Sequence, residues 1–200
     1  MSEARRRLLL RAGGLLALTL ALPSCAKKQE PFQGTDITGV DWGRDFRLGD
    51  HTGRPRTLAD FRGQAVLLFF GYTHCPDACP TTLAKMARAV ELLGEDGARV
   101  QGLFVTLDPA RDTAAVLGQY VPAFHPNFLG LRGSEAEVVR TAGDFKLFFA
   151  RQAPDASGFY TVDHQPAVYA FDPQGRLRLL YFRGKSEPQV IAHDLRILLR

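Results

Sequence analysis

Two cysteines with three residues between them lie in the segment GYTHCPDACP, which separates an apolar run from a stretch with helical periodicity. Cys75 and Cys79 could form a disulfide, act as a nucleophile and its resolving partner, or provide two ligands for a metal ion. A proline suits the first residue of a helix, so we expect Pro80 to open the helix with Cys79 at its cap. The positive end of a helix favours the thiolate, which is the form that attacks disulfides and binds metals.

The spacing of the two cysteines favours a metal without excluding redox chemistry. The sulfurs of a disulfide lie about 2 Å apart. Two thiolates on one ion, with metal–sulfur bonds of about 2.3 Å, would lie nearer 4 Å apart. A loop with three intervening residues can open around an ion and still close to a bond. Two soft thiolates suit Cu(I), with zinc as an alternative. Histidine is the usual third ligand beside two thiolates.

Of the five histidines, His164 is the candidate third ligand. It stands in VDHQPAVYAF just before an expected core strand, where a thioredoxin-like sheet would bring it beside the cysteine loop. His74 adjoins the first cysteine and is expected to point elsewhere. Asp163 could orient the imidazole of His164 without binding the metal itself, as carboxylates often do for metal-binding histidines. Asp77 is expected to face solvent. The remaining histidines are interpreted as solvated or capping residues: His51, His125 and His193.

The elements that must position these residues alternate between strand and helix and then end in a hairpin and a helix. The continuous apolar run at 65–70 predicts a buried, parallel central strand, and a helix is expected to follow to about residue 93. Asp112 is expected to cap a later helix, and Ser134 with Glu137 forms a capping box for the next. Further elements are expected as a hairpin at 45–64, strands at 99–107 and 127–132, two strands joined by a long turn at 146–164, a hairpin at 167–182 and a helix from 186.

This order predicts an α/β fold, a thioredoxin-like three-layer sandwich with a central mixed sheet and an inserted β-hairpin. The segment DPARD at 108–112 is interpreted as a turn and helix cap that braces the site without chemistry of its own. We therefore expect the cysteine loop and His164 to meet at one end of the sheet.

The first 24 residues have the pattern of a signal peptide, with a charged start and an apolar run at 13–22 that is short for a membrane span. A retained anchor helix is the alternative. The segment RRLLLR also resembles a twin-arginine signal, and LPSC resembles a bacterial lipobox, which predicts a lipid on Cys25. We therefore expect a signal peptide at 1–24, a tether at 25–41 and a domain at 42–200, anchored extracytoplasmically to a bacterial membrane as a lipoprotein.

The charge belongs mostly to the leader, because four of the 25 basic residues lie within 1–24. The rest is nearly neutral and has no basic stripe with interleaved aromatic residues, so no nucleic-acid partner is expected. If Cys25 carries lipid, Cys75 and Cys79 remain as a pair in an oxidising compartment. A disulfide that closes so short a loop would remove little chain entropy, which argues against a purely structural role.

Three segments in order, FFGYTHCPDACPTTL, TLDPARDT and YTVDH, resemble the Sco/SenC family of copper chaperones from about residue 45 to the C-terminus. The resemblance implies a thioredoxin-like domain that binds one copper, as Cu(I) or Cu(II), through Cys75, Cys79 and His164. It also implies a role in assembling the dinuclear copper site of cytochrome c oxidase. The implied partners are the copper-bearing subunit of the oxidase and a copper donor chaperone. Pro166 departs from the family pattern and resembles the cis-proline of thioredoxin, which strengthens the redox alternative.

These observations support one first hypothesis and two alternatives. The first is a membrane-tethered copper metallochaperone, which binds and transfers copper and is not an enzyme. The second is a thiol–disulfide oxidoreductase that reduces the cysteines of the oxidase subunit or another extracytoplasmic target. A peroxidase of the peroxiredoxin type is disfavoured, because its chemistry needs a hydroxyl residue and an arginine around one cysteine. His164 separates the first two, because dithiol chemistry does not require it and a three-coordinate copper site does.

Overall fold

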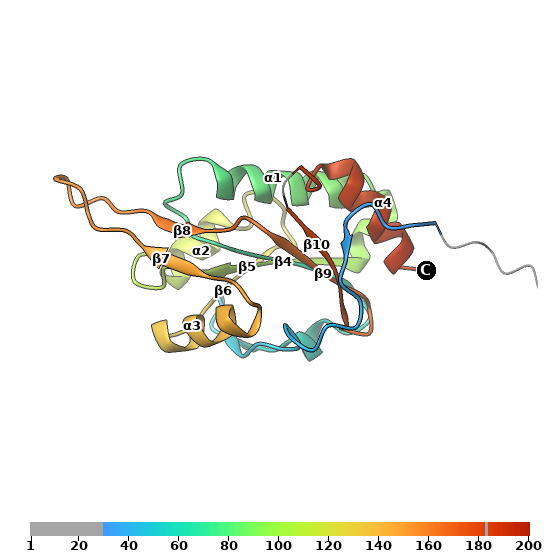
Figure 1. Cartoon of the computed structure of the whole chain (residues 1–200), viewed down its shortest axis with the longest axis horizontal. Coiled ribbons are helices and arrows are strands. Elements are labelled where there is room, and N and C mark those ends of the chain that lie inside the picture. The colour runs from blue at the N-terminus through green and yellow to red at the C-terminus, as the bar shows by residue number, and fades with distance from the viewer. Residues whose placement is uncertain (1–29, 183) are drawn as a thin grey trace, which may run out of the picture. The chain divides into compact units, whose positions relative to one another are not determined.

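The computed structural model describes residues 30–182 and 184–200. Within this part of the chain, eight strands form one mixed sheet in the order β1-β10-β9-β4-β5-β6-β2-β3 (Figure 1). The strands are β1 (Thr35–Asp36), β2 (Leu48–Asp50), β3 (Pro55–Arg56), β4 (Ala65–Gly71), β5 (Val100–Thr106), β6 (Leu129–Arg132), β9 (Val168–Phe171) and β10 (Leu177–Tyr181).

Strand β4 occupies the centre of this sheet, parallel to β5 and antiparallel to β9. All seven of its residues are buried, which requires cover on both faces and explains the continuous apolar run. Helices α1 (Ala78–Glu91) and α4 (Pro188–Leu198) lie side by side along one face, and α3 (Glu135–Asp144) lies on the other (Figure 1). The expected three-layer α/β arrangement and its buried central strand are therefore confirmed.

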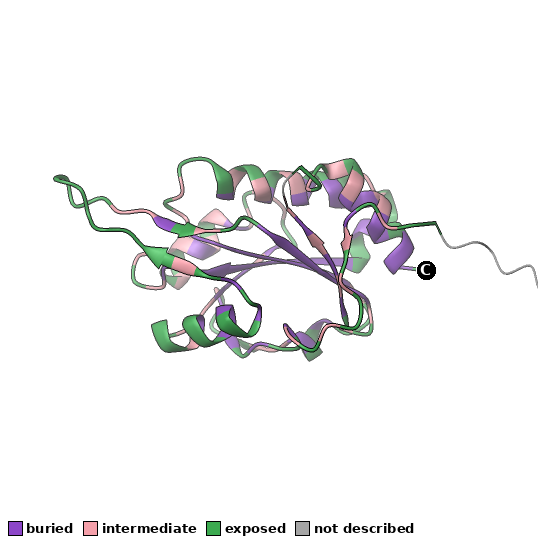
Figure 2. Cartoon of the chain, in the orientation of Figure 1, coloured by how far each residue is buried: buried purple, intermediate pink, exposed green. Residues whose placement is uncertain are grey.

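The strands β7 (Phe149–Arg151) and β8 (Val162–His164) form a separate two-stranded antiparallel sheet. Its long connecting turn projects from the rest of the domain and is exposed, whereas the central strands β4, β5 and β9 of the main sheet are wholly buried (Figure 2). This pair is the inserted hairpin that the sequence predicted. It carries His164 at the end of β8, directly ahead of the core strand β9.

The helix starts differ from expectation at two places. Helix α1 begins at Ala78, so Cys79 is its second residue and Pro80 its third, rather than the cap and the first residue. Pro80 is tolerated there because the amides of a first turn have no partner within the helix. The cap of α2 (Ala114–Tyr120) is Thr113, whose side chain accepts from the amide of Val116. Asp112 does not cap this helix, because its carboxylate is engaged elsewhere.

The capping box of α3 is confirmed: the side chain of Ser134 accepts from the amide of Glu137, whose carboxylate accepts in return from the amide of Ser134. The proline ahead of β9 differs from the cis-proline that it resembles. Every peptide bond in the described residues is trans, including the one before Pro166.

Residues ahead of position 42 also contact the main sheet and α4. Strand β1 adds to the edge of β10, and the carboxylate of Asp194 in α4 accepts from the amides of Gln33 and Gly34. The predicted signal peptide and the lipidated Cys25 lie outside the described residues. None of the helices in the described part of the chain is long and apolar enough to span a membrane.

Candidate metal centre

The two thiols sit at the start of α1 in different surroundings. Both are free, and Cys79 is completely buried while Cys75, in the preceding loop, is half-buried. The backbone amide of Cys79 donates to Sγ of Cys75 over 3.4 Å. Gly71 at the end of β4 makes room for the other sulfur, since a Cβ at this position would lie 2.8 Å from Sγ of Cys79. The strand end and the helix start therefore fix both sulfurs.

His164 approaches this pair from the inserted hairpin. Its Nε2 lies 3.9 Å from Sγ of Cys79. Its Nδ1 lies 3.0 Å from the carbonyl oxygen of Val162, which can only accept a hydrogen bond. Nδ1 therefore carries the proton in this arrangement, and Nε2 presents its lone pair toward the sulfur. The rings of Phe69 and Tyr72 lie beside the imidazole, with centroids 6.4 and 6.0 Å away.

Burial and hydrogen bonding give the three groups different protonation behaviour. Burial raises the pKa of the Cys79 thiol far above its ordinary value. Burial also acts to raise the pKa of Cys75. Hydrogen bonds from the amides of Asp77 and Cys79, with those from the side chains of Cys79 and Tyr72, together outweigh it and bring that pKa below its ordinary value. Burial lowers the pKa of His164, which keeps the imidazole neutral and able to bind a metal. The site thus offers one accessible thiol with a lowered pKa, one buried thiol with a raised pKa and one neutral imidazole.

These donors suit a soft ion, because thiolate and imidazole together are the ligands that monovalent copper and zinc prefer. The arrangement is not a closed metal cage. Among the described residues, no three histidine, cysteine, aspartate or glutamate side chains stand close enough together to hold an ion without adjustment. The structure brings Cys79 and His164 together directly, and Cys75 is joined to them through the amide of Cys79.

Asp163 does not orient His164 in the expected way. Its carboxylate accepts from the side-chain amide of Gln152 over 2.6 Å, and the carbonyl of Val162 fixes the imidazole instead. Asp77 is exposed, makes no side-chain cap to α1, and accepts from the hydroxyl of Thr81 over 3.3 Å.

The other histidines have structural partners of their own. His51 accepts from the amide of Gly130, and His125 accepts from the amide of Asn127. The ring of His74 lies against the hydroxyl of Thr73 rather than toward the buried sulfur of the pair. None of these contacts reaches His164 or Cys79, so His164 is the histidine that the fold brings to the cysteine loop.

An open groove of about 870 Å³ runs beside His164. Its lining is mostly apolar, and Phe148 in it is 91% exposed. The lining residues are Phe148, Phe149, Ala150, Asp163, His164, Gln165, Pro166 and Phe182.

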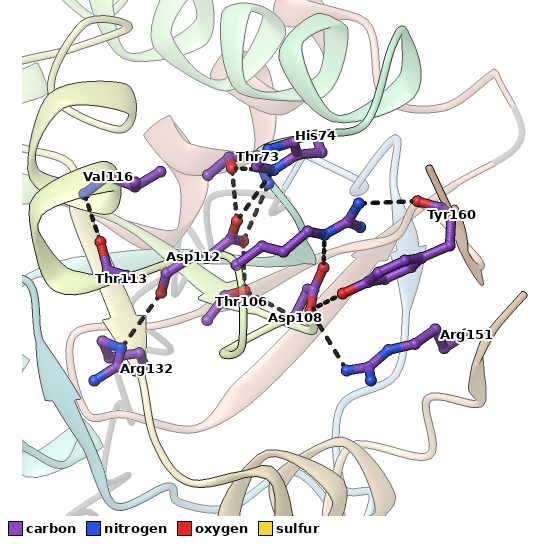
Figure 3. A network of polar contacts seen from close by, with 11 residues as sticks. Thr73, His74, Thr106, Asp108, Asp112, Thr113, Val116, Arg132, Arg151 and Tyr160 are labelled. Carbon is purple, nitrogen blue, oxygen red and sulfur yellow. Dashed lines mark hydrogen bonds and ion pairs between the residues drawn. The ribbon is translucent and has the colours of Figure 1, made fainter. Parts of the chain in front are cut away.

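Two buried aspartates next to the centre belong to the segment 108–112, which the sequence predicted to brace the site without chemistry of its own. Asp112 is fully buried and accepts from the amide of Thr73 over 3.1 Å, from its hydroxyl over 2.6 Å, and from the hydroxyl of Thr106 over 2.6 Å (Figure 3). Since Thr73 lies two residues before Cys75, Asp112 anchors the cysteine loop. Asp108 is also fully buried and contacts the inserted hairpin. The available signal was that both aspartates stand in the short segment between a buried strand and the next helix, which composition alone assigns to a turn.

Comparison with known proteins agrees with this geometry. The model of the SCO1/SenC family matches residues 35–200. The mitochondrial SCO2 homologue of Bos taurus is 45% identical over 148 residues, which are 73% of this chain and 56% of that protein. The chain therefore spans just over half the length of this relative.

Solved structures show the same fold. The solution structure of apo Sco1 from Thermus thermophilus is 41% identical, with a TM-score of 0.76 over 86% of this chain and 99% of that chain. The structure of Bradyrhizobium japonicum ScoI with copper bound is 35% identical, with a TM-score of 0.69 over 76% of this chain and 96% of that chain. These likenesses confirm the thioredoxin-like fold class.

Proposed function

The chain belongs to the SCO1/SenC family, and we propose that it is a membrane-tethered metallochaperone that carries one copper ion between Cys75, Cys79 and His164. One observation carries the proposal: Nε2 of His164 lies 3.9 Å from Sγ of Cys79, although 85 residues separate them in the chain. Two ligands on one ion, at the bond lengths known for zinc, lie about 3.5 to 3.8 Å apart. The pair is thus already near the separation that a shared ion requires.

The three groups have different roles toward the copper ion. Cys75 is the accessible cysteine and its thiol has the lower pKa of the two, so it is the first sulfur that an arriving ion can meet. Cys79 must lose its proton when the ion binds, since a thiol becomes a ligand only as thiolate. His164 is neutral and supplies its Nε2 lone pair without proton loss. Copper binding therefore releases protons mainly from the thiols, and its affinity rises with pH.

The acceptor that we propose is the dinuclear copper site of cytochrome c oxidase, since oxidase assembly is the role attached to the Sco family. Solved Sco structures hold copper, which supports copper as the cargo. The proposed partners are the copper-bearing oxidase subunit and a copper donor chaperone. The proposed location is the extracytoplasmic side of a bacterial membrane, where a lipid on Cys25 would anchor the chain.

The test is a titration of the reduced full chain with Cu(I) in competition with a strong chelator. We expect one copper per chain, and we expect His164→Ala to lose more than the 10- to 100-fold in affinity that an outer-shell change costs. His125→Ala serves as the control, because that imidazole bonds only within its own loop. Wild-type affinity in the His164→Ala variant would remove the histidine from the site.

A thiol–disulfide reductase remains the second candidate, because one accessible, low-pKa cysteine is followed by one buried, high-pKa cysteine. The thiolate of Cys75 would attack a target disulfide and release one target thiolate, forming a mixed disulfide. The sulfur of Cys79 would then attack Sγ of Cys75, release the second target thiol, and leave the pair oxidised by two electrons. This exchange does not use His164, so His164→Ala should reduce a target disulfide at the wild-type rate under either hypothesis.

The two functions are separated in cells that lack the native protein. If copper delivery is the function, His164→Ala leaves the oxidase short of copper as severely as the cysteine variants do. If oxidase activity falls only with Cys75→Ser and Cys79→Ser, the reductase function replaces the chaperone function.

A further inference from the structure

The loop between β5 and α2 contacts both halves of the candidate centre. Asp112 on this loop holds the cysteine side through Thr73. Asp108, at the start of the same loop, is equally buried and points to the inserted hairpin that carries His164 (Figure 3). Arg132 on β6 fixes the loop from below by donating to the carbonyl oxygens of Asp112 and Pro109.

A single carboxylate joins both strands of the hairpin to this loop. Asp108 accepts from the hydroxyl of Tyr160 over 3.0 Å, and Tyr160 lies four residues before His164 on the approach to β8. The carboxylate of Asp108 also accepts from the guanidinium of Arg151 on β7 over 3.5 Å. The third donor to the Asp108 carboxylate is Nε of Arg111, which forms a short ion pair with it. Asp108 therefore receives three donors, of which two come from the hairpin.

Arg111 makes the second connection to the hairpin. Its Nη1 donates to the carbonyl oxygen of Tyr160 over 3.1 Å, and its guanidinium carbon lies 3.5 Å from the centroid of the Tyr160 ring. The planar guanidinium thus bonds a carboxylate and a carbonyl while it stacks on an aromatic face. A lysine at this position could keep the charge but not these three contacts together.

The hairpin requires such external contacts to hold its place. In the described residues, β8 pairs with β7 and not with the main sheet. A two-stranded sheet alone is marginally stable in water, so its own ladder does not fix where His164 stands. The bond from Nδ1 of His164 to Val162 orients the imidazole within the hairpin, but it does not connect the hairpin to the cysteine loop.

We propose that Asp108, Arg111 and Tyr160, named here the Asp108 cluster, are positioning residues that hold the His164 hairpin against the cysteine loop and thereby set copper affinity. This inference rests on the proposed copper-binding function. Asp108 and Tyr160 act on the histidine half of the centre, since the cysteine loop is anchored separately through Asp112 and Thr73. Arg111 also lies 5.8 Å from the ring of Tyr72, directly ahead of the cysteine loop. Loss of the bond between Tyr160 and Asp108 therefore weakens copper binding and leaves the redox potential of the Cys75–Cys79 pair unchanged.

The test compares graded variants of the full chain. Tyr160→Phe removes the hydroxyl bond to Asp108 and keeps the ring, whereas Arg111→Ala removes the bond to the Tyr160 carbonyl and the stacking. We expect copper affinity to fall about 10- to 100-fold in Arg111→Ala, the cost typical of losing a partner that orients a metal ligand, and less in Tyr160→Phe. Arg111→Lys should recover only part of the loss. Tyr169→Phe is the matched control, because its hydroxyl also makes one hydrogen bond, to the carbonyl of Phe145 in the core.

Three readouts separate positioning from simple stability. Copper affinity is measured by chelator competition, and the midpoint potential of the Cys75–Cys79 pair by equilibration with a redox buffer. Amide hydrogen exchange over Val162–His164 is measured on the metal-free chain. We expect weaker copper binding and faster exchange in both Tyr160→Phe and Arg111→Ala, and an unchanged potential in Tyr160→Phe. Tyr169→Phe should be like the wild type in all three measurements.

The outcomes also distinguish this inference from the proposed function. If the wild type binds no copper but exchange at Val162–His164 still accelerates in the variants, the positioning role of the cluster stands and the copper function fails. If the wild type binds copper and neither affinity nor exchange changes in Tyr160→Phe and Arg111→Lys, the inference is overturned. An equal loss of affinity in Tyr169→Phe would also overturn it, since the effect would then follow general stability. If Arg111→Ala does not fold, Tyr160→Phe carries the same comparison.

Discussion

The backbone amide of Cys79 donates to the sulfur of Cys75 over 3.4 Å, so the first turn of α1 stabilises one cysteine of the pair as a thiolate. The sulfur of Cys79 is completely buried and lies next to Gly71 at the end of β4. A helix start that supports one thiolate and covers the second thiol gives the two cysteines unequal reactivity. The inequality serves copper capture and disulfide exchange alike, and it is directly measurable.

Alkylation is expected to reach Cys75 first. Hydrogen bonds bring its pKa below the ordinary value, so its alkylation rate should reach half-maximum at a lower pH than that of an unperturbed cysteine. The raised pKa and burial of Cys79 keep it a protonated, shielded thiol over the same range. Peptide mass spectrometry after brief iodoacetamide treatment across a pH series measures the extent of alkylation at Cys75 and at Cys79. Equal labelling of the two cysteines in the folded chain would contradict the assigned asymmetry.

Copper binding is expected to require the reduced pair. A Cys75–Cys79 disulfide removes two of the three proposed ligands at once, and His164 alone does not hold Cu(I) against a competing chelator. The oxidised chain should therefore bind almost no copper until a reductant is added, as measured by equilibrium dialysis with metal analysis. The His125→Ala variant should behave like the wild type in both states. Equal stoichiometry in the oxidised and reduced forms would remove the cysteines from the site.

The mature chain is expected to begin at Cys25 with lipid attached, because LPSC follows an apolar run. Mass spectrometry of protein extracted from membranes should show a diacylglycerol-modified N-terminal cysteine. Cys25→Ser should release the chain from the membrane fraction without changing copper affinity, since the described domain starts beyond this residue. A chain that keeps residues 1–24, or a wild type recovered in soluble form, would contradict the prediction.

The main elements of the fold could be predicted because their signals are local. The apolar run of β4 and the Ser134–Glu137 capping box depend on residues a few positions apart, and both are confirmed. The proximity of His164 to the cysteine loop was predictable only from the expected order of strands and from family resemblance. The exact distance depends on the packing of α1 against the hairpin, which no local pattern encodes.

The errors share a physical origin in tertiary contacts. Asp112 has the residue type and place of a helix cap, but burial next to Thr73 and Thr106 gives its carboxylate better donors. Asp163 stands beside the metal-binding candidate in sequence, yet alternation along β8 turns its side chain toward Gln152. In both cases the carboxylate bonds to a residue that the fold brings near, and not to the neighbouring group that the sequence suggested.

Gly71 connects the core directly to the centre. It ends β4, and a Cβ at this position would meet both Sγ of Cys79 and the ring of Phe104 at 2.8 Å. Neither neighbour can give way easily, because both are completely buried in the core. We expect Gly71→Ala to cost about 1 to 3 kcal/mol of unfolding free energy, as overpacking does, measured by urea denaturation. The same methyl group should push the sulfur out of place and weaken copper binding.

Gly143 in α3 provides the matched comparison. A Cβ there meets nothing within 4 Å, and the residue has ordinary helical backbone angles. Gly143→Ala should therefore raise the unfolding free energy by about 0.5 to 1 kcal/mol, because alanine favours the helix, and should leave copper affinity unchanged. If Gly71→Ala keeps both stability and copper affinity, the close packing between β4 and the sulfur of Cys79 does not set the geometry of the centre. If it loses stability alone, the sulfur can be displaced without cost to copper, and the proposed ligand set must be reconsidered.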